Sequence, residues 1–517
     1  MAGRKEEVSS FKYSAVKQTV LTEERTEVPL PNDNISIPYG LVKTIEHYLG
    51  SVGVLSLLDA FKERGVPLRR IAVAVCTCIL MGSNSMSRCA DWLSDPNVMK
   101  ELGFENKVSQ RTINRAVEII GAHTDEIIGQ LWKGLSTRYD FENTDVNIDG
   151  SAVVFNGPMS ELGEIGYPRD FKDQSRPQVE FMTAQLQESG IPIFIRTYRG
   201  NTSDAEQYRD VLPEVFRMIR EGSWIIMDNG GAASDILDSI VWSGNKYLTR
   251  LKMNTSDDLR ISQNKDNWEY VEDGICCLRH TFASSGRTTY LFFSADNFVR
   301  SRNAARRSVL QMVDAVHSYE NGKFRQSDFV TVKDNLAADV SITKMDIQTH
   351  FGYDDPEEIE RMTEDKTGVR AGIFKLESSE QLTPSEALKK YRARASVEHL
   401  IHSLKRITGL KPMRVWKLNS IRGSAVLALL SEAAVAMARY ELDPTPVTKM
   451  KKGKTTTVER RPATESMVWS LTQLTVCRIV EKRCGKGAVY SNWNVLSRKV
   501  FANIRSGYQV KRVSADG

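Results

Sequence analysis

The sequence is poor in cysteine, with only 7 Cys among its 517 residues, and no two of them are spaced as a C-x-x-C pair. Their number is odd and none is spaced as a zinc ribbon requires, so we expect neither a zinc ribbon nor a disulfide framework, but reduced thiols in the cytoplasm. Long apolar runs are also missing. The longest, Ile71–Met81, has 11 residues, which is about half of what a transmembrane helix needs. The N-terminal sequence MAGRKEEVSS lacks the apolar core of a signal peptide. These absences argue against a membrane or secreted protein.

The chain has little net charge, because 70 Lys and Arg face 65 Asp and Glu and leave a formal charge of +5. That excess is local. Residues 449–461, which include Lys451 and Lys452, carry +5 by themselves. The range Lys389–Lys417 holds nine basic residues and a single acid, Glu398. Basic clusters in a neutral chain favour an anionic partner such as nucleic acid, although two solvated faces would give the same pattern.

Residues 40–140 show the apolar periodicity of helices. Ser109 can cap a helix whose first turns would present Arg111 and Arg115 to DNA. A preceding helix over Ser87–Leu93 would complete a helix-turn-helix pair. An ordinary surface helix fits the same residues, so the pattern leaves DNA binding by this region open.

Alternating apolar residues begin near Val146 and predict strands. A helix should follow the third strand, because Ser203 and Glu206 form a capping box. The order strand, strand, strand, helix, strand, helix, strand describes an α/β fold in which helices cover a mixed sheet. The predicted strands are Asp145–Asn156, Gln178–Gln187, Ile191–Arg199, Trp224–Asp228 and Lys246–Lys252, and the last helix among them is Ala233–Trp242.

The length suits about three domains. Residues 253–382 interrupt the sheet pattern with a helical run near Val299–Val313 and strand-like pieces at Thr288–Ser294, Asp328–Val332 and Gly372–Leu376, so we interpret them as an insertion. A helix is also expected near Glu465–Arg483. The predicted segments are a loose arm (1–39), a helical, candidate DNA-binding domain (40–140), a first core part (141–252), the insertion (253–382), a second core part (383–440) and a basic linker with a helical tail (441–517).

The clearest local signal is a helix of about 25 residues that begins at Thr383, where Glu386 completes a capping pattern. At 100° per residue, five polar side chains share a stripe about 80° wide. They are Tyr391, Arg394, Glu398, His402 and Lys405. One acid among cations suits a metal ion held beside a phosphate chain. Taken alone, the helix is explained more simply by routine ion pairs such as Arg394–Glu398.

Two further acids lie in predicted strands, Asp149 in the first and Asp228 at the end of the fourth. A carboxylate inside an apolar strand costs several kcal/mol unless it is paired or bound to a metal. The first and fourth strands are natural neighbours in the proposed order, so these carboxylates should meet. Clustered carboxylates imply divalent cations, and oxygen ligands favour Mg²⁺ or Mn²⁺. The nearby acids expected to serve as surface or capping residues are Asp145, Asp235 and Asp238.

Together these residues resemble the DDE insertion-sequence transposases that carry a Y-R-E-K signature. The signature spacing is intact from Tyr391 through Arg394 and Glu398 to Lys405. The segment that starts at Asp149 resembles the first acidic motif of the family, and the resemblance extends over residues 143–439. The second motif departs from the family, because Asn and not a basic residue follows Asp228.

The resemblance implies an RNase H-like sheet flanked by helices, with a strand-rich insertion and an additional N-terminal helical domain. It implies that Asp149, Asp228 and Glu398 are catalytic and bind two Mg²⁺ or Mn²⁺ ions. The activity would be cleavage of double-stranded DNA at terminal inverted repeats and strand transfer into target DNA, by a homodimer that associates with the nucleoid. Side chains expected to bind DNA are Tyr391, Arg394 and Lys405 from the signature, Arg111 and Arg115 from the helical region, and Lys451 and Lys452 from the basic linker. His402 shares the polar stripe but is not part of the signature, and both a contact with DNA and a structural role fit it.

Two alternatives remain open on the sequence. One is an RNase H-like endonuclease that cuts DNA without strand transfer. The other is a repurposed DNA-binding protein without catalytic activity, against which the intact acids and signature argue.

Overall fold

The computed structural model describes residues 37–157, 159–166, 176–320, 356–406, 410, 413, 415–451, 454–479 and 487–506. Within it the chain forms two compact units, the first from residues 1–225 and 393–517 and the second from residues 226–392. Most of the expected N-terminal arm, the expected strand Asp328–Val332 and Lys452 lie outside the described residues.

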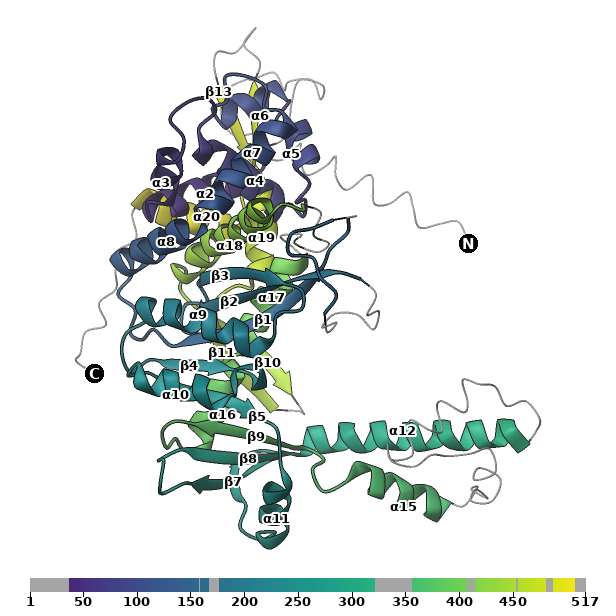
Figure 1. The fold of residues 1–517 in the computed structure, drawn as a ribbon. Helices are drawn as coiled ribbons and strands as arrows, with labels where there is room; N and C mark the ends of the chain where they lie inside the picture. The colour runs from purple at the N-terminus through teal and green to yellow at the C-terminus, as the bar shows by residue number, and fades with distance from the viewer. Residues whose placement is uncertain are drawn as a thin grey trace. The chain divides into compact units, whose positions relative to one another are not determined.

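The first unit begins with helices, as the periodicity of residues 40–140 predicts (Figure 1). Ser109 caps its helix as expected, since its hydroxyl accepts a hydrogen bond from Thr112 N at 3.2 Å. The simple helix-turn-helix prediction is wrong, because a further helix, α6, stands between the two expected helices. These helices are α2 (Tyr39–Ser51), α3 (Val54–Ala60), α4 (Leu68–Leu80), α5 (Met86–Trp92), α6 (Pro96–Glu101), α7 (Gln110–Ala122) and α8 (Thr124–Arg138).

The strands of the first unit lie in the order β3–β2–β1–β4, so the first and fourth strands are neighbours as predicted. The β1–β2 and β2–β3 pairs are antiparallel. The capping box of Ser203 and Glu206 is present at the start of α9. The elements are β1 (Val146–Val154), β2 (Gln178–Leu186), β3 (Pro192–Arg199), α9 (Asp204–Met218) and β4 (Trp224–Met227), and the boundary between the units falls inside β4.

Asp145, expected from the sequence to be a surface or capping residue, is buried, with only 7% of it exposed. Its Oδ1 accepts a hydrogen bond from the backbone N of Trp224 at 2.8 Å. Beside it, the hydroxyls of Thr144 and Ser223 are 2.7 Å apart. These contacts hold the start of β4 against the start of β1, which explains why a carboxylate is tolerated there.

Helix α18 (Leu418–Tyr440) forms the centre of the first unit and packs against α2, α4, α7 and β3. It is long and apolar enough to cross a membrane by composition, but 94% of its most apolar window is buried inside the protein, as expected of a core helix. Its crossing with α7 is close. A Cβ on Gly121 would lie 1.7 Å from Asn419 O, and one on Gly423 would lie 2.1 Å from Val117 O. Only glycine therefore permits these two helices to touch backbone to backbone.

The long helix expected after Thr383 is in fact two helices, α16 (Pro384–Ala393) and α17 (Ala395–Arg406), which separate at Arg394. The backbone N of Val397 donates to Arg394 O at 3.0 Å, so α17 begins with its own tight turn. The predicted cap holds, since Thr383 Oγ1 donates to Glu386 Oε2 at 2.7 Å. The single polar stripe is therefore divided between two helices.

The C-terminal tail also differs from the prediction. The basic linker forms an antiparallel hairpin of β10 (Thr445–Lys451) and β11 (Lys454–Arg460). The expected helix near Glu465–Arg483 ends early, as α19 (Thr464–Gln473), and is followed by the strand pair β12 (Thr475–Ile479) and β13 (Gly487–Ser491). The last described element is α20 (Val495–Ser506).

The second unit holds strands in the order β5–β9–β8–β7–β6. The strand-like pieces expected at Thr288–Ser294 and Gly372–Leu376 appear as β8 and β9. Figure 1 shows α12 and α15 side by side, extending away from these strands. The elements are a short 3-10 turn (Asn229–Gly231), α10 (Ser234–Trp242), β5 (Lys246–Leu251), α11 (Thr255–Gln263), β6 (Glu269–Glu272), β7 (Ile275–Thr281), β8 (Thr288–Ser294), α12 (Ala295–Glu320), α15 (Pro356–Thr367), β9 (Ile373–Ser378) and α16.

Candidate active site

Two of the three predicted acids meet at one cation. Arg394 Nη1 lies 3.0 Å from Asp149 Oδ2, and Arg394 Nη2 lies 2.7 Å from Glu398 Oε1. The side chains of Asp149 and Arg394 are 14% and 13% exposed, whereas that of Glu398 is 57% exposed. One guanidinium therefore neutralises the charge of a largely buried carboxylate from β1 and of an exposed carboxylate from α17. Both carboxylates point toward Arg394.

Strand β1 positions Asp149 through its regular pairing with β2, in which Asp149 faces Thr183. The Asp149 Oδ1 atom also accepts a hydrogen bond from the backbone N of Gly150 at 3.0 Å. One oxygen is thus held by the backbone while the other is directed at Arg394. The interpretation of Asp149 as a paired carboxylate inside a strand agrees with this geometry.

Asn147 fixes the start of α17 to β1, a role that sequence reasoning missed. Its Nδ2 donates to Ser396 Oγ at 3.0 Å and to Ala393 O at 3.3 Å, and its Oδ1 accepts from Gln187 Nε2 at 3.1 Å. Asn147 is fully buried. The sequence does contain a signal for this role. Asn147 is a polar amide in a largely apolar strand, two positions before Asp149 and therefore on the same face of the strand. Because Asn147 holds the first turn of α17, it also sets where Glu398 stands.

Glu432 in α18 anchors the far end of α17. It is buried, and it accepts a hydrogen bond from the hydroxyl of Ser403. Burial raises the pKa of this carboxyl to about 7, and the bond from Ser403 opposes that shift. The buried side chains of Val397 and Leu404 complete the packed face of α17.

The third predicted acid, Asp228, belongs to the second unit. It caps the short turn Asn229–Gly231, where its Oδ1 accepts from Gly230 N at 2.8 Å. Its carbonyl accepts a hydrogen bond from Thr249 Oγ1 at 2.9 Å. Among the described residues, no group of three or more His, Cys, Asp or Glu is arranged to hold a metal ion. The three-acid set therefore stays a prediction.

The residues predicted to bind DNA fall into different surroundings. Tyr391 is half-buried in α16, His402 is exposed on α17, and Lys405 is buried, with 8% of it exposed. Burial of Lys405 does not fit an open polar stripe. Arg111 and Arg115 are exposed on α7.

In the tail, Lys451 ends β10, where it pairs with Lys454.

The atoms that converge on Arg394 are carboxylate oxygens of Asp149 and Glu398. Carboxylate oxygens are the ligands that Mg²⁺ and Mn²⁺ prefer. Two carboxylates that together attract one guanidinium provide two negative charges, which match the charge of a divalent ion. The chemistry of Asp149 and Glu398 therefore fits the metal implied by the resemblance.

Comparison with known proteins identifies the class. The family model for a transposase DDE domain matches residues 148–431, which is more than half of the chain and includes Asp149, Asp228 and Glu398. The chain therefore belongs to the family of DDE transposases and is a DNA transposase.

Solved structures similar to this chain include transposase complexes. A piggyBac transposase synaptic complex with hairpin DNA is 10% identical, with a TM-score of 0.40, and the match covers 87% of this chain and 82% of that chain. A Mos1 transposase paired-end complex with the left transposon end is 15% identical, with a TM-score of 0.16, over 36% of this chain and 60% of that chain. No curated protein matches the sequence.

Proposed function

We propose that this transposase cuts DNA at the ends of its own element and joins the freed 3′-hydroxyl to target DNA, with Asp149, Asp228 and Glu398 as ligands for two divalent ions. The observation that carries the proposal is the convergence of the Asp149 and Glu398 carboxylates on one cation. The signature spacing from Tyr391 to Lys405 and the family membership support it.

In the proposed reaction, water attacks a backbone phosphorus, the bond from phosphorus to the 3′-oxygen breaks, and a 3′-hydroxyl and a 5′-phosphate are released. When bound, the divalent ions would activate the attacking oxygen and offset charge on the phosphate. Asp149 and Glu398 hold position through β1, Asn147 and the first turn of α17. Strand transfer repeats the displacement, with the 3′-hydroxyl as the attacking group.

Arg394 has two uses in this scheme. Its guanidinium neutralises both carboxylates. If divalent ions took over that role, the guanidinium would be free to form a bidentate bond to a DNA phosphate, for which its planar shape is suited. Tyr391 is proposed to contact the DNA end beside Arg394. Lys405 is buried in this structure and would have to become exposed to contact DNA as well.

The direct test is cleavage and strand transfer with DNA that contains the ends of the element and Mg²⁺ or Mn²⁺. Asp149→Asn, Asp228→Asn and Glu398→Gln should each reduce cleavage by at least about 1,000-fold, whereas Glu63→Gln, an exposed acid on the surface, should not. Unchanged cleavage in any one of the three variants removes that residue from the site. Cleavage without any joined product would favour the endonuclease alternative instead.

We further propose that a homodimer assembles on DNA, because two transposon ends require two such sites. Mass photometry of the protein with and without end-containing DNA tests this. A complex with two DNA ends and two protein chains supports the proposal, and one chain per DNA end at saturation contradicts it.

A further inference from the structure

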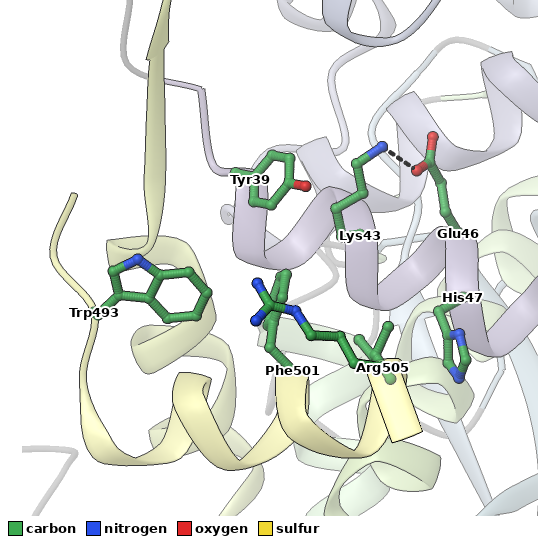
Figure 2. A pocket seen from close by; sticks show the side chains of 8 residues that line it. Tyr39, Lys43, Glu46, His47, Trp493, Phe501 and Arg505 are labelled. Atoms are coloured by element: carbon green, nitrogen blue, oxygen red, sulfur yellow. Dashed lines mark hydrogen bonds and ion pairs between the residues drawn. The ribbon is translucent and has the colours of Figure 1, made fainter. Parts of the chain in front are cut away.

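A cavity of about 440 Å³ lies between α2 and α20 in the first unit (Figure 2). Three aromatic side chains line it. The Tyr39 ring stacks on the buried ring of Phe501 with 5.8 Å between centroids, and Trp493 meets Phe501 edge-on at 5.3 Å. Figure 2 shows Tyr39 from α2 and Trp493 from the segment before α20 on different sides of the cavity. Its volume is in the range that holds a planar ligand of modest size.

Two basic side chains, Lys43 and Arg505, line the same cavity as the aromatic rings. Lys43 Nζ lies 5.6 Å from the centroid of the Tyr39 ring and 2.7 Å from Glu46 Oε2. Both members of that ion pair are about one-third exposed, so water weakens it and a phosphate can replace Glu46. Arg505 also lines the cavity, and its side chain is exposed.

Helix α20 has a pronounced charge bias. It carries Arg498, Lys499 and Arg505, all of them exposed, and its 12 residues include no acid. An acid-free helix beside an aromatic cavity combines the two features by which proteins bind single-stranded nucleic acid, a cationic track for phosphates and rings for bases. The apolar wall by itself would suit many ligands, and the cations select an anionic one.

We propose that this cavity binds one unstacked nucleobase of a DNA strand, while the cations of α20 hold the adjacent phosphates. The base would lie against Tyr39 and Trp493, and stacking of this kind accepts any base. The choice of DNA as the ligand rests on the proposed function. A segment of single strand is present wherever a DNA end is opened, so the cavity would favour frayed or cleaved ends over blunt duplex.

The test uses the full-length protein and a duplex with a single-stranded extension that contains 2-aminopurine. Stacking on an aromatic ring should quench its fluorescence. Trp493→Leu should remove the quenching and weaken binding of the extended duplex about tenfold, with little change for a blunt duplex. Trp469→Leu is the matched control, because Trp469 lies on neighbouring α19, is 64% exposed and does not line the cavity.

A second variant tests the cationic part. Arg505→Ala should reduce the salt dependence of binding by about one phosphate contact, whereas Arg64→Ala, at an exposed position elsewhere, should not. Thermal unfolding followed by circular dichroism shows whether each variant is folded. If Trp493→Leu does not fold, Arg505→Ala still tests the proposal.

Three outcomes would overturn the proposal. Equal binding of extended and blunt DNA by the wild type, or unchanged binding by a folded Trp493→Leu variant, would leave the cluster a packing element only. Saturable binding of a free deoxynucleotide monophosphate that Trp493→Leu abolishes, without any effect on DNA, would assign the cavity to a free nucleotide. Metal-dependent cleavage by the wild type at saturating DNA is measured in parallel. Loss of the proposed base binding with cleavage intact contradicts only this inference, whereas absence of cleavage counts against the proposed function.

Discussion

Arg394 Nη1 lies 3.0 Å from Asp149 Oδ2, although 245 positions of sequence separate the two residues. The same guanidinium binds Glu398, four residues further along the chain. A basic residue of the signature thus neutralises the negative charge of two of the acids.

Replacement of Arg394 should therefore tighten metal binding. We expect Arg394→Gln to bind Mn²⁺ about five- to tenfold more tightly than the wild type in the absence of DNA, because the ion no longer competes with a cation for the two carboxylates. Isothermal titration calorimetry measures this. Arg392→Gln is the control, since that exposed arginine pairs with Glu272 instead. Weaker binding by Arg394→Gln would mean that the arginine organises the ligands and does not compete for them.

Loss of Asn147 should affect cleavage more than DNA binding. Asn147→Ala removes the bonds that hold the first turn of α17 to β1, so Glu398 loses its fixed position. We expect cleavage to fall by about 10- to 100-fold with DNA affinity within about twofold. Gln187→Ala should have a smaller effect, because it removes a bond that orients Asn147 and leaves the bonds from Asn147 to α17 in place. Equal loss of DNA affinity and cleavage would show instead that Asn147→Ala unfolds the region.

Glu432 should make the stability of the first unit depend on pH. Its folded pKa is raised by burial to about 7, so this carboxyl stays protonated in the folded protein where it has already ionised in the unfolded chain. Its stabilising contribution is complete below about pH 4 and is lost as the pH rises to 7. Relative to Glu432→Gln, the wild type should lose about 3 kcal/mol of unfolding free energy as the pH rises from about 4 to 7.

Urea unfolding of both proteins at several pH values measures the difference. Glu63→Gln, at an exposed position, should follow the wild type throughout. A constant difference between Glu432→Gln and the wild type from pH 5 to 8 would contradict the raised pKa.

Glu441 should be a strong stabilising contact between the N-terminal helices and the end of α18. Its fully buried carboxylate accepts hydrogen bonds from Tyr48 Oη at 2.8 Å and Tyr139 Oη at 2.8 Å, and Arg138 Nη2 lies 2.7 Å away. Glu441→Ala leaves the guanidinium and both hydroxyls without their acceptor. We expect a loss of about 3 kcal/mol of unfolding free energy, measured by denaturant titration.

The matched comparison for Glu441 is Glu188→Ala, an acid that accepts a hydrogen bond from Tyr440 Oη at an exposed position. Its loss should cost less than about 1 kcal/mol. Similar effects for the two variants would mean that burial adds nothing to the Glu441 contacts.

The sequence alone determined the local elements, because caps and apolar periodicity act over a few neighbouring residues. The helix starts at Ser203 and Thr383 and the strand that contains Asp149 were predicted from such signals, and the signature spacing from Tyr391 to Lys405 indicated the family. The tail hairpin also carries a local signal, since the run of Thr and Val in residues 455–458 is typical of a strand.

Only the tertiary structure decided how the ends of these elements meet. The anchoring of α17 by Asn147 and the ion pair of Arg394 with Asp149 join residues that are 249 and 245 positions apart. The break at Arg394 and the burial of Lys405 were likewise seen only in the folded chain. Helical periodicity assumed one straight helix and placed Arg394 toward DNA. A largely buried carboxylate at Asp149 needs a compensating charge, and that requirement, which no local pattern encodes, directs Arg394 inward to the two acids.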